Sequence, residues 1–417
     1  MNFKYITTSP GLGGRIKQYA EDFVVSEIGK DYETNVLYLP NKKVVDIDWS
    51  EIFQKKGDNQ FLILDLEKYN LSTTTAINKI ARFLRISKQR INYAGLKDKR
   101  AITSQRISIY DPSQERVSIC FFRDIKLYNP QWSNKRIEIG DLLENKFVVT
   151  IRNIDLSEDQ IKQIVFQAFS EIEKNGLINY FGEQRFGGVR EITHLVGKHF
   201  LKKEYKEGVL LYLTYINDLE KEDIKNARKE LANDLNFKKH AAYFPTKTGY
   251  ERAILNYLAN HPDDFLGAIK VLPKSIQYLF IHAYQSYLFN ELINLRFEKG
   301  YGLNQIDGDK VVNDEVYLPL FGFESVFSDG LAGDLEKEIL SKEGVSFKDF
   351  YNKDYGVLSS KGGLRPIKTN VKDLKLLEIL DDELNEHKKK AIVSFRLDKG
   401  QYATIVLREL IKEEIIG

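Results

Sequence analysis

The sequence has a single cysteine among its 417 residues, only nine prolines, and a formal net charge of just +2. Cys120 therefore has no partner for an intramolecular disulfide, and no group of Cys and His has the spacing of a zinc site. No stretch approaches the roughly 20 apolar residues of a membrane helix, and the N-terminus lacks the apolar core of a signal peptide. These absences predict a soluble, cytoplasmic protein without a structural metal.

The charges are nearly balanced, with 62 Lys and Arg against 60 Asp and Glu, so a surface that binds nucleic acid would have to be local. The hydrophobic share of 42% is typical of a globular protein, and the length favours two domains. The run "GLGG" at Gly11–Gly14 lacks the strand before and the helix after it that a dinucleotide-binding loop needs. We therefore expect no cofactor.

Alternating and continuous apolar runs predict strands at Phe23–Val25, from Phe61 in "FLILDLEK", at Ile107–Tyr110 and in "NKFVVTIRNI". Near the C-terminus, "AIVSFRLDKGQYATIVLRELI" is expected to form two strands around a turn at Gly400, followed by a helix. These strands would belong to one sheet.

Helical spacing is clearest in two places. After Leu71 one face carries apolar residues, with Ser72 or Thr73 available as the cap; they are Ile77, Ile80, Ala81 and Leu84. The second helix starts at a capping-box pattern, Ser157 with Gln160, and Gly176 can end it. Its apolar face consists of Ile161, Ile164, Val165, Ala168, Phe169 and Ile172.

The composition changes past Arg190 to helical sequence rich in Lys and Glu, which continues to "SSKGGLRPI". In that run Gly362, Gly363 and Pro366 are typical of a linker back to the first domain. We therefore expect one domain made of residues 1–189 and 367–417, interrupted by an inserted domain of residues 190–366.

Three stretches mix charged, aromatic and glycine residues in a way that packing does not require, and the third is "QYATIVLRELI" near the C-terminus. In "AGLKDKRAITSQ", Asp98 lies on an expected loop beside Lys97, Lys99 and Arg100, and nearby positive charge keeps a carboxylate ionised, as a nucleophile or base requires. A solvated charged turn is the alternative. In "NYFGEQRFGG", aromatics alternate with Asn179, Gln184 and Arg185, which suits stacking on an RNA base and bonding to its edge. A turn anchored in the core by its Phe residues is equally compatible.

The third stretch and the histidines carry less information. Thr404 and Arg408 lie in an otherwise apolar segment, where Arg408 could simply pair with Glu409. His194 and His199 are expected to be exposed helical histidines. Neither group defines a site by itself.

Together the motifs resemble the TruD/Pus7 family of tRNA pseudouridine synthases, in the right order along nearly the whole chain. The pattern of a basic residue before "EDFxVxE" appears as Lys17 followed by residues 21–27, and "AGxKDxxAxTxQ" appears at residues 94–105. "NYFGxQRFG" is complete at residues 179–187, and "SYLFN" and "GQYATIVLREL" match later segments. "ENKFVVTIR" matches "GxxFxxxxR" except that Glu144 replaces a small residue.

The resemblance implies an α+β fold: a pseudouridine-synthase catalytic domain with a mixed, largely antiparallel sheet, and an inserted α/β TRUD domain. It implies an isomerase of the intramolecular-transferase type that acts on tRNA, with uridine 13 of the D arm as the usual target, and neither metal nor cofactor. The alternatives are a catalytically silent tRNA-binding or folding factor on the same scaffold, and a methyltransferase, for which no cofactor loop is found. The oligomeric state stays open.

For the site, the resemblance implies that Asp98 is the nucleophile and Lys17 its basic partner. Phe181 would stack on the uracil and Asn179 would form a hydrogen bond nearby. The remaining expected substrate contacts are Lys97, Gln184, Arg185 and Thr404.

Overall fold

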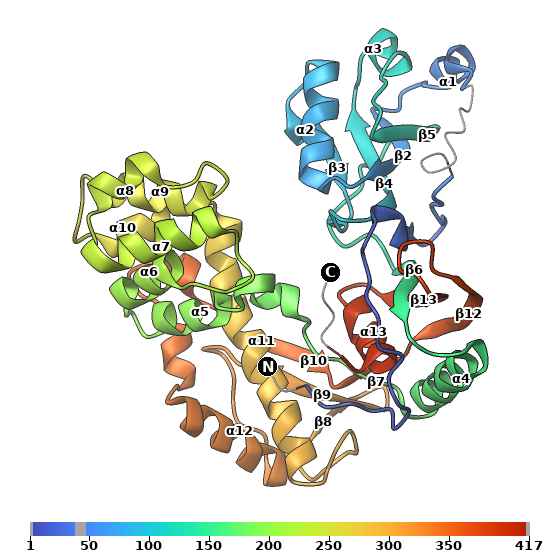
Figure 1. Cartoon of the computed structure of the whole chain (residues 1–417). Helices are drawn as coiled ribbons and strands as arrows, with labels where there is room; N and C mark the ends of the chain where they lie inside the picture. The colour runs from blue at the N-terminus through green and yellow to red at the C-terminus, as the bar shows by residue number, and fades with distance from the viewer. Residues whose placement is uncertain (1–2, 38–46, 414–417) are drawn as a thin grey trace. The chain divides into compact units, whose positions relative to one another are not determined.

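The computed structural model describes residues 3–37 and 47–413. The chain forms two compact units, which are described separately (Figure 1). The sheet unit consists of Tyr5–Leu177 and Asn370–Gly417, and the helical unit consists of Ile178–Thr369 with residues 3 and 4. No helix in the described part of the chain is long and apolar enough to cross a membrane.

The sheet unit is built around one mixed sheet, whose order is β12-β13-β6-β1-β4-β2-β5, with β3 also paired to β4. The pair β1–β4 is parallel, whereas the other neighbours run antiparallel, which confirms the predicted mixed, largely antiparallel sheet. The strands are β1 (Phe23–Ile28), β2 (Phe61–Tyr69), β3 (Ile91–Tyr93), β4 (Ile102–Tyr110), β5 (Ile125–Ser133), β6 (Glu144–Ile154), β12 (Lys372–Asp381) and β13 (Lys389–Asp398).

The parallel pair fixes where the first sequence motifs meet. Val24 of β1 is opposite Ile102 of β4, so the two strands begin at the same end of the sheet. The segment that carries Lys17 leads into β1, and the loop that carries Asp98 leads into β4. The register therefore places both segments at the same end of the sheet, although Lys17 and Asp98 are 81 positions apart in the sequence.

The helices and short turns of the sheet unit are η1 (Ala20–Asp22), α1 (Trp49–Gln54), α2 (Thr73–Leu84), η2 (Lys88–Arg90), α3 (Gln114–Ser118), α4 (Glu158–Asn175) and α13 (Ala403–Ile411). Ser72 caps α2, and the apolar face of this helix is buried on Leu62, Leu64 and Ile107 of the sheet. The Ser157–Gln160 capping box of α4 and its end at Gly176 are both confirmed.

One predicted strand is absent. The segment after Gly400 forms α13 directly, so the expected second strand around the Gly400 turn is wrong. Five of its seven buried residues follow the i, i+3, i+4, i+7 spacing of a helix: Ala403, Val406, Leu407, Leu410 and Ile411. That periodicity outweighs the strand preference of the β-branched Thr404, Ile405 and Val406.

The helical unit is organised along α11 (Lys274–Glu298), which packs against α5 (Thr193–Leu201) (Figure 1). Its other helices and helical turns are η3 (Glu183–Phe186), η4 (Gly188–Arg190), α6 (Tyr205–Thr214), α7 (Glu222–Asp234), α8 (Phe237–Tyr243), α9 (Gly249–Leu258), α10 (Phe265–Lys270), α12 (Gly330–Glu343), η5 (Phe347–Phe350) and η6 (Gly356–Leu358). A small antiparallel sheet has the order β10 (Gly363–Pro366), β9 (Glu315–Leu320) and β8 (Lys310–Val312), and β11 (Lys368–Thr369) pairs with β7 (Leu177–Ile178).

Candidate active site

The centre of the candidate site in the sheet unit is an ion pair between Lys17 and Asp98. The Lys17 ammonium lies 2.9 Å from Oδ1 of Asp98 and 4.0 Å from the centroid of the Phe23 ring. The Lys17 side chain is only 10% exposed, whereas that of Asp98 is 28% exposed. The carboxylate is thus held by a buried cation and is itself still reachable from solvent.

A second lysine fixes the main chain of the Asp98 loop. Lys68, on β2, is fully buried, and its ammonium donates to the carbonyl oxygen of Asp98 at 2.6 Å. Burial lowers the pKa of Lys68 to about 8, the charge of Asp98 opposes this change, and the charge of Lys97 adds to it. Asp98 is therefore contacted by one lysine at its side chain and by another at its backbone.

Lys97, the neighbour of Asp98 in the sequence, does not pair with Asp98 but with another carboxylate. Its ammonium lies 2.5 Å from Oε2 of Glu27, a fully buried carboxylate on β1. The backbone N–H of Lys97 donates to Thr73, whose hydroxyl donates to Gln105. Gln105 in turn donates to the carbonyl of Gly95, so contacts from α2, β1 and β4 hold the "AGLKD" loop.

Thr404 belongs to the same unit but is not part of the hydrogen-bond network around Asp98. It is half-buried in the first turn of α13. Within the described part of the chain its side chain donates and accepts no hydrogen bond. The structure therefore brings Lys17, Lys97 and Asp98 together through shared loops and does not connect Thr404 to them.

The predicted residues of the second motif lie in the helical unit. Asn179 is buried: its amide nitrogen donates to the Pro366 carbonyl, and its side-chain oxygen accepts from Arg365 at 2.5 Å. The Phe181 ring, 7% exposed, has the Arg365 guanidinium 4.1 Å from its centroid and Phe289 edge-on at 5.5 Å. This geometry forms a cationic and aromatic platform.

Asn290 and Arg185 contact this platform, whereas Gln184 is exposed. The backbone N–H and carbonyl of Phe181 are both bonded to the side chain of Asn290 on α11, each at 2.9 Å. Arg185 donates to the Ser286 hydroxyl at 3.1 Å and lies 5.6 Å from the Phe181 ring centroid. Gln184 is exposed on η3.

In the described residues, no group of three or more His, Cys, Asp or Glu could hold a metal ion. The ionisable groups of the sheet-unit site instead form lysine–carboxylate pairs, so the chemistry that the arrangement itself offers is that of a nucleophile or base next to an ammonium.

Comparison with known proteins shows the family. The model of the family "tRNA pseudouridine synthase D (TruD)" matches residues 2–316 and 312–410. A protein of Methanosarcina acetivorans named probable tRNA pseudouridine synthase D is 35% identical, over 98% of this chain and 95% of the relative. A similarly named protein of Methanopyrus kandleri is 35% identical over 86% of this chain and 87% of its own.

A crystal structure from Methanosarcina mazei, of a protein assigned to tRNA pseudouridine synthase D (TruD), matches with a TM-score of 0.77 and 34% identity. The match covers 98% of this chain and 96% of that one. The chain belongs to the TruD family of tRNA pseudouridine synthases. The family resemblance that was drawn from the sequence motifs is thereby confirmed.

Sequence reasoning missed several residues of this TruD family member. Lys68 could have been found from the sequence, because "FLILDLEK" places three charged residues in an otherwise apolar strand. All three, Asp65, Glu67 and Lys68, are buried. Arg365 lies in the "GGLRP" run, for which the sequence predicts a linker. Asn290 belongs to "SYLFN", a motif from which the sequence predicts no role for this residue.

Two expectations about side chains change. His194 is not exposed: it is 7% exposed between the rings of Phe186 and Tyr287, and burial lowers its pKa to about 4. Glu409 is buried and accepts hydrogen bonds from the backbone N–H groups of Ile6 and Thr7. It thus fixes the start of the chain on α13.

Proposed function

We propose that this TruD family member converts a uridine of tRNA to pseudouridine, with uridine 13 of the D arm as its target. The observation that carries the proposal is the Lys17–Asp98 pair: a partly exposed carboxylate, 2.9 Å from a buried ammonium, on the family's "AGxKD" loop. The sheet unit would be the catalytic domain. The proposed activity is that of an isomerase, since no atom is added to or removed from the base overall.

The reaction breaks the bond between N1 of uracil and C1' of the ribose, rotates the base, and joins C5 to C1'. The proton on C5 is then released. We propose that Asp98 assists the cleavage, by attack on C6 or C1' or by removal of the C2' proton. Each of these routes requires an ionised carboxylate.

Lys17 would keep the carboxylate charged and oriented, because its ammonium is fixed beneath Asp98 by burial and by the Phe23 ring. Lys68 would hold the backbone of the same residue, so that the nucleophile does not move when the base rotates. Preorganisation of this kind needs no rearrangement at the moment of reaction.

For the helical unit we propose contact with the RNA at the Phe181 platform. An extruded base would stack on the Arg365 guanidinium plane or on the small exposed part of the Phe181 ring, which is 7% exposed. Asn179 is held by Arg365 and Pro366, and its proposed part is to keep the Arg365 guanidinium in place beside the ring. Gln184 and Arg185 are proposed as further RNA contacts.

The test is release of tritium from tRNA transcripts made with 5-tritiated uridine, because forming the C5–C1' bond expels the label. A matched transcript in which cytidine replaces uridine 13 serves as the control. Release from the first transcript and not from the second is the expected result. Binding of tRNA without release from any of several tRNAs would contradict the proposal and would favour a silent tRNA-binding factor.

A further inference from the structure

Lys17 has a backbone conformation that needs support from its surroundings. Its φ of 56° lies in the left-handed region, which a residue with a β-carbon adopts at a cost of roughly 1–2 kcal/mol. Such a conformation persists only where neighbouring contacts over-determine it. The contacts around residues 15–22 therefore decide whether the Lys17 ammonium reaches Asp98.

Arg152, near the end of β6, holds the chain on both sides of Lys17. Before it, the backbones of Arg15 and Arg152 exchange two hydrogen bonds, each of 2.8 Å. After it, Nε of Arg152 donates to Oδ1 of Asp22 at 2.7 Å, and Oδ2 of Asp22 accepts from the backbone N–H of Tyr19 at 2.7 Å. One residue of β6 thus fixes both ends of the short segment that presents Lys17.

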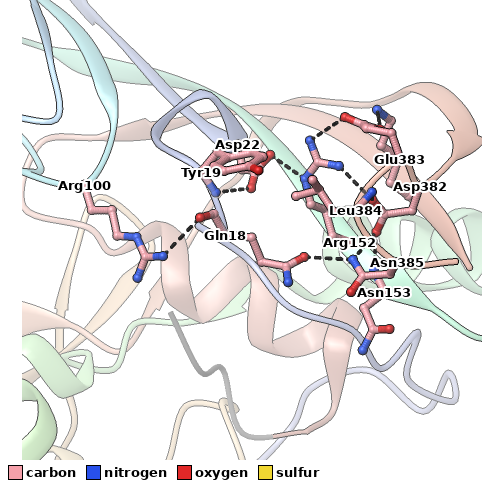
Figure 2. Close-up of polar contacts among 11 residues, drawn as sticks. Gln18, Tyr19, Asp22, Arg100, Arg152, Asn153, Asp382, Glu383, Leu384 and Asn385 are labelled. Atoms are coloured by element: carbon pink, nitrogen blue, oxygen red, sulfur yellow. Dashed lines mark hydrogen bonds and ion pairs between the residues drawn. The ribbon is translucent and has the colours of Figure 1, made fainter.

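The same guanidinium joins this segment to the turn between β12 and β13 (Figure 2). It donates to Asp382 at 2.8 Å and to Glu383 at 3.1 Å. Arg152, Asp22 and Asp382 are nearly fully buried, whereas the Glu383 side chain is 55% exposed. Burial alone would lower the pKa of Arg152, but its hydrogen bonds to Glu383, Asp22 and Asp382 raise it above the usual range, so the guanidinium stays charged.

Gln18, the residue after Lys17, is held from two directions (Figure 2). Its side-chain oxygen accepts from Asn385 at 3.1 Å, and Asn385 is itself bonded to Asp382 at 2.7 Å. Its backbone carbonyl accepts from Arg100, two positions beyond Asp98, at 3.1 Å. The Asp98 loop and the Lys17 segment are thus connected by a contact that is independent of the ion pair.

We propose that Arg152 is a positioning residue, which acts through Asp22, Asp382 and Asn385 to hold Lys17 in the conformation that pairs with Asp98. The proposal deepens the proposed function and depends on it for its catalytic consequence. Its structural consequence, a Lys17 side chain that is protected while Arg152 is intact, can be measured without any activity.

The experiment compares the full-length wild type with Arg152→Gln and with Asn385→Ala. Asn385→Ala retains the charged side chains of the cluster and removes only amide hydrogen bonds, so it serves if Arg152→Gln fails to fold. Arg228→Gln is the matched control: Arg228, in the helical unit, is also buried and pairs with two carboxylates, Glu220 and Glu251.

The structural measurement is the rate at which acetic anhydride labels Lys17, quantified by mass spectrometry. Lys97 is the internal reference, because it is also nearly buried and paired in the same unit. We expect Arg152→Gln to raise the labelling rate of Lys17 by about tenfold through local opening, with Lys97 unchanged. Arg228→Gln should lower the unfolding temperature and leave Lys17 protected.

The kinetic measurement is tritium release at saturating and at limiting tRNA. A misplaced Lys17 should lower kcat by roughly a hundredfold in Arg152→Gln and by about three- to tenfold in Asn385→Ala, with KM for tRNA nearly constant. Unchanged Lys17 labelling and unchanged kcat in both variants would overturn the proposal. A wild type that releases no tritium would refute the proposed function instead, while the labelling result would still decide the role of Arg152.

Discussion

Replacing Lys97 by Met should destabilise the sheet unit strongly, because it leaves the Glu27 carboxylate buried without its cation. Glu27 is fully buried, and the Lys97 ammonium lies 2.5 Å from it. Removing one partner of such a pair costs about 3–5 kcal/mol of unfolding free energy. Glu27 keeps hydrogen bonds from the Tyr32 hydroxyl and the Arg106 backbone N–H, so we expect the lower end of that range, about 3 kcal/mol.

The chain offers a convenient probe for this experiment. Its two tryptophans, Trp49 and Trp132, both lie in the sheet unit, so tryptophan fluorescence during urea unfolding reports on that unit. With an m-value of about 3 kcal/mol/M, a loss of 3 kcal/mol moves the midpoint down by about 1 M urea.

The double variant Lys97→Met, Glu27→Gln is the control, because it removes the unpaired charge. We expect it to recover about 2 kcal/mol of the loss. A single variant with the midpoint of the wild type would show that the buried Glu27 carboxylate does not need the Lys97 cation. So would a double variant that is no more stable than the single one.

Three further predictions concern the same two loops and the platform. The pKa of Lys68 falls from 10.5 in the unfolded state to about 8 in the folded state, so the unfolded state binds more protons between these two pH values. The unfolding free energy of the wild type should therefore rise by about 3 kcal/mol relative to that of Lys68→Met between pH 8 and pH 10.5. Unfolding curves at several pH values measure that difference, and a constant difference would contradict the desolvation of Lys68. Lys17→Met should lower kcat by roughly a hundredfold or more, with little loss of stability because Asp98 is partly solvated, and full activity would remove Lys17 from the mechanism. Phe181→Ala should reduce activity on tRNA by about tenfold more than Phe181→Tyr, since only Ala removes a stacking surface of about 1–3 kcal/mol, and equal rates would exclude stacking.

Local sequence signals predicted the elements that depend on local physics. The Ser157–Gln160 capping box and the apolar face of α4 were readable because cap and periodicity both lie within a few residues. After Gly400 the two signals disagree: the β-branched residues favour a strand, whereas the apolar spacing favours the helix that the structure contains. Strand propensity is thus a weaker signal than the helical spacing of apolar residues.

The candidate site was predictable only as separate motifs. The charged loop indicated Asp98, and the family resemblance implied Lys17 as its partner. The contact between them depends on β1 and β4 being parallel neighbours, which no local pattern specifies. The hydrogen bond from Lys68 to Asp98 and the ion pair of Arg152 with Asp22 likewise join residues that are 30 and 130 positions apart. Such contacts depend on sheet order and register.

The most direct test of the central claim is a single-turnover comparison of the wild type with Asp98→Asn on tRNA that carries 5-tritiated uridine. Asn has the size of Asp but cannot act as a nucleophile or base, and equal tryptophan fluorescence would show that the sheet unit, which contains residue 98, is folded in both proteins. We expect tritium release by the wild type and none above background by the variant. Release by Asp98→Asn at the wild-type rate would show that Asp98 is neither the nucleophile nor the base.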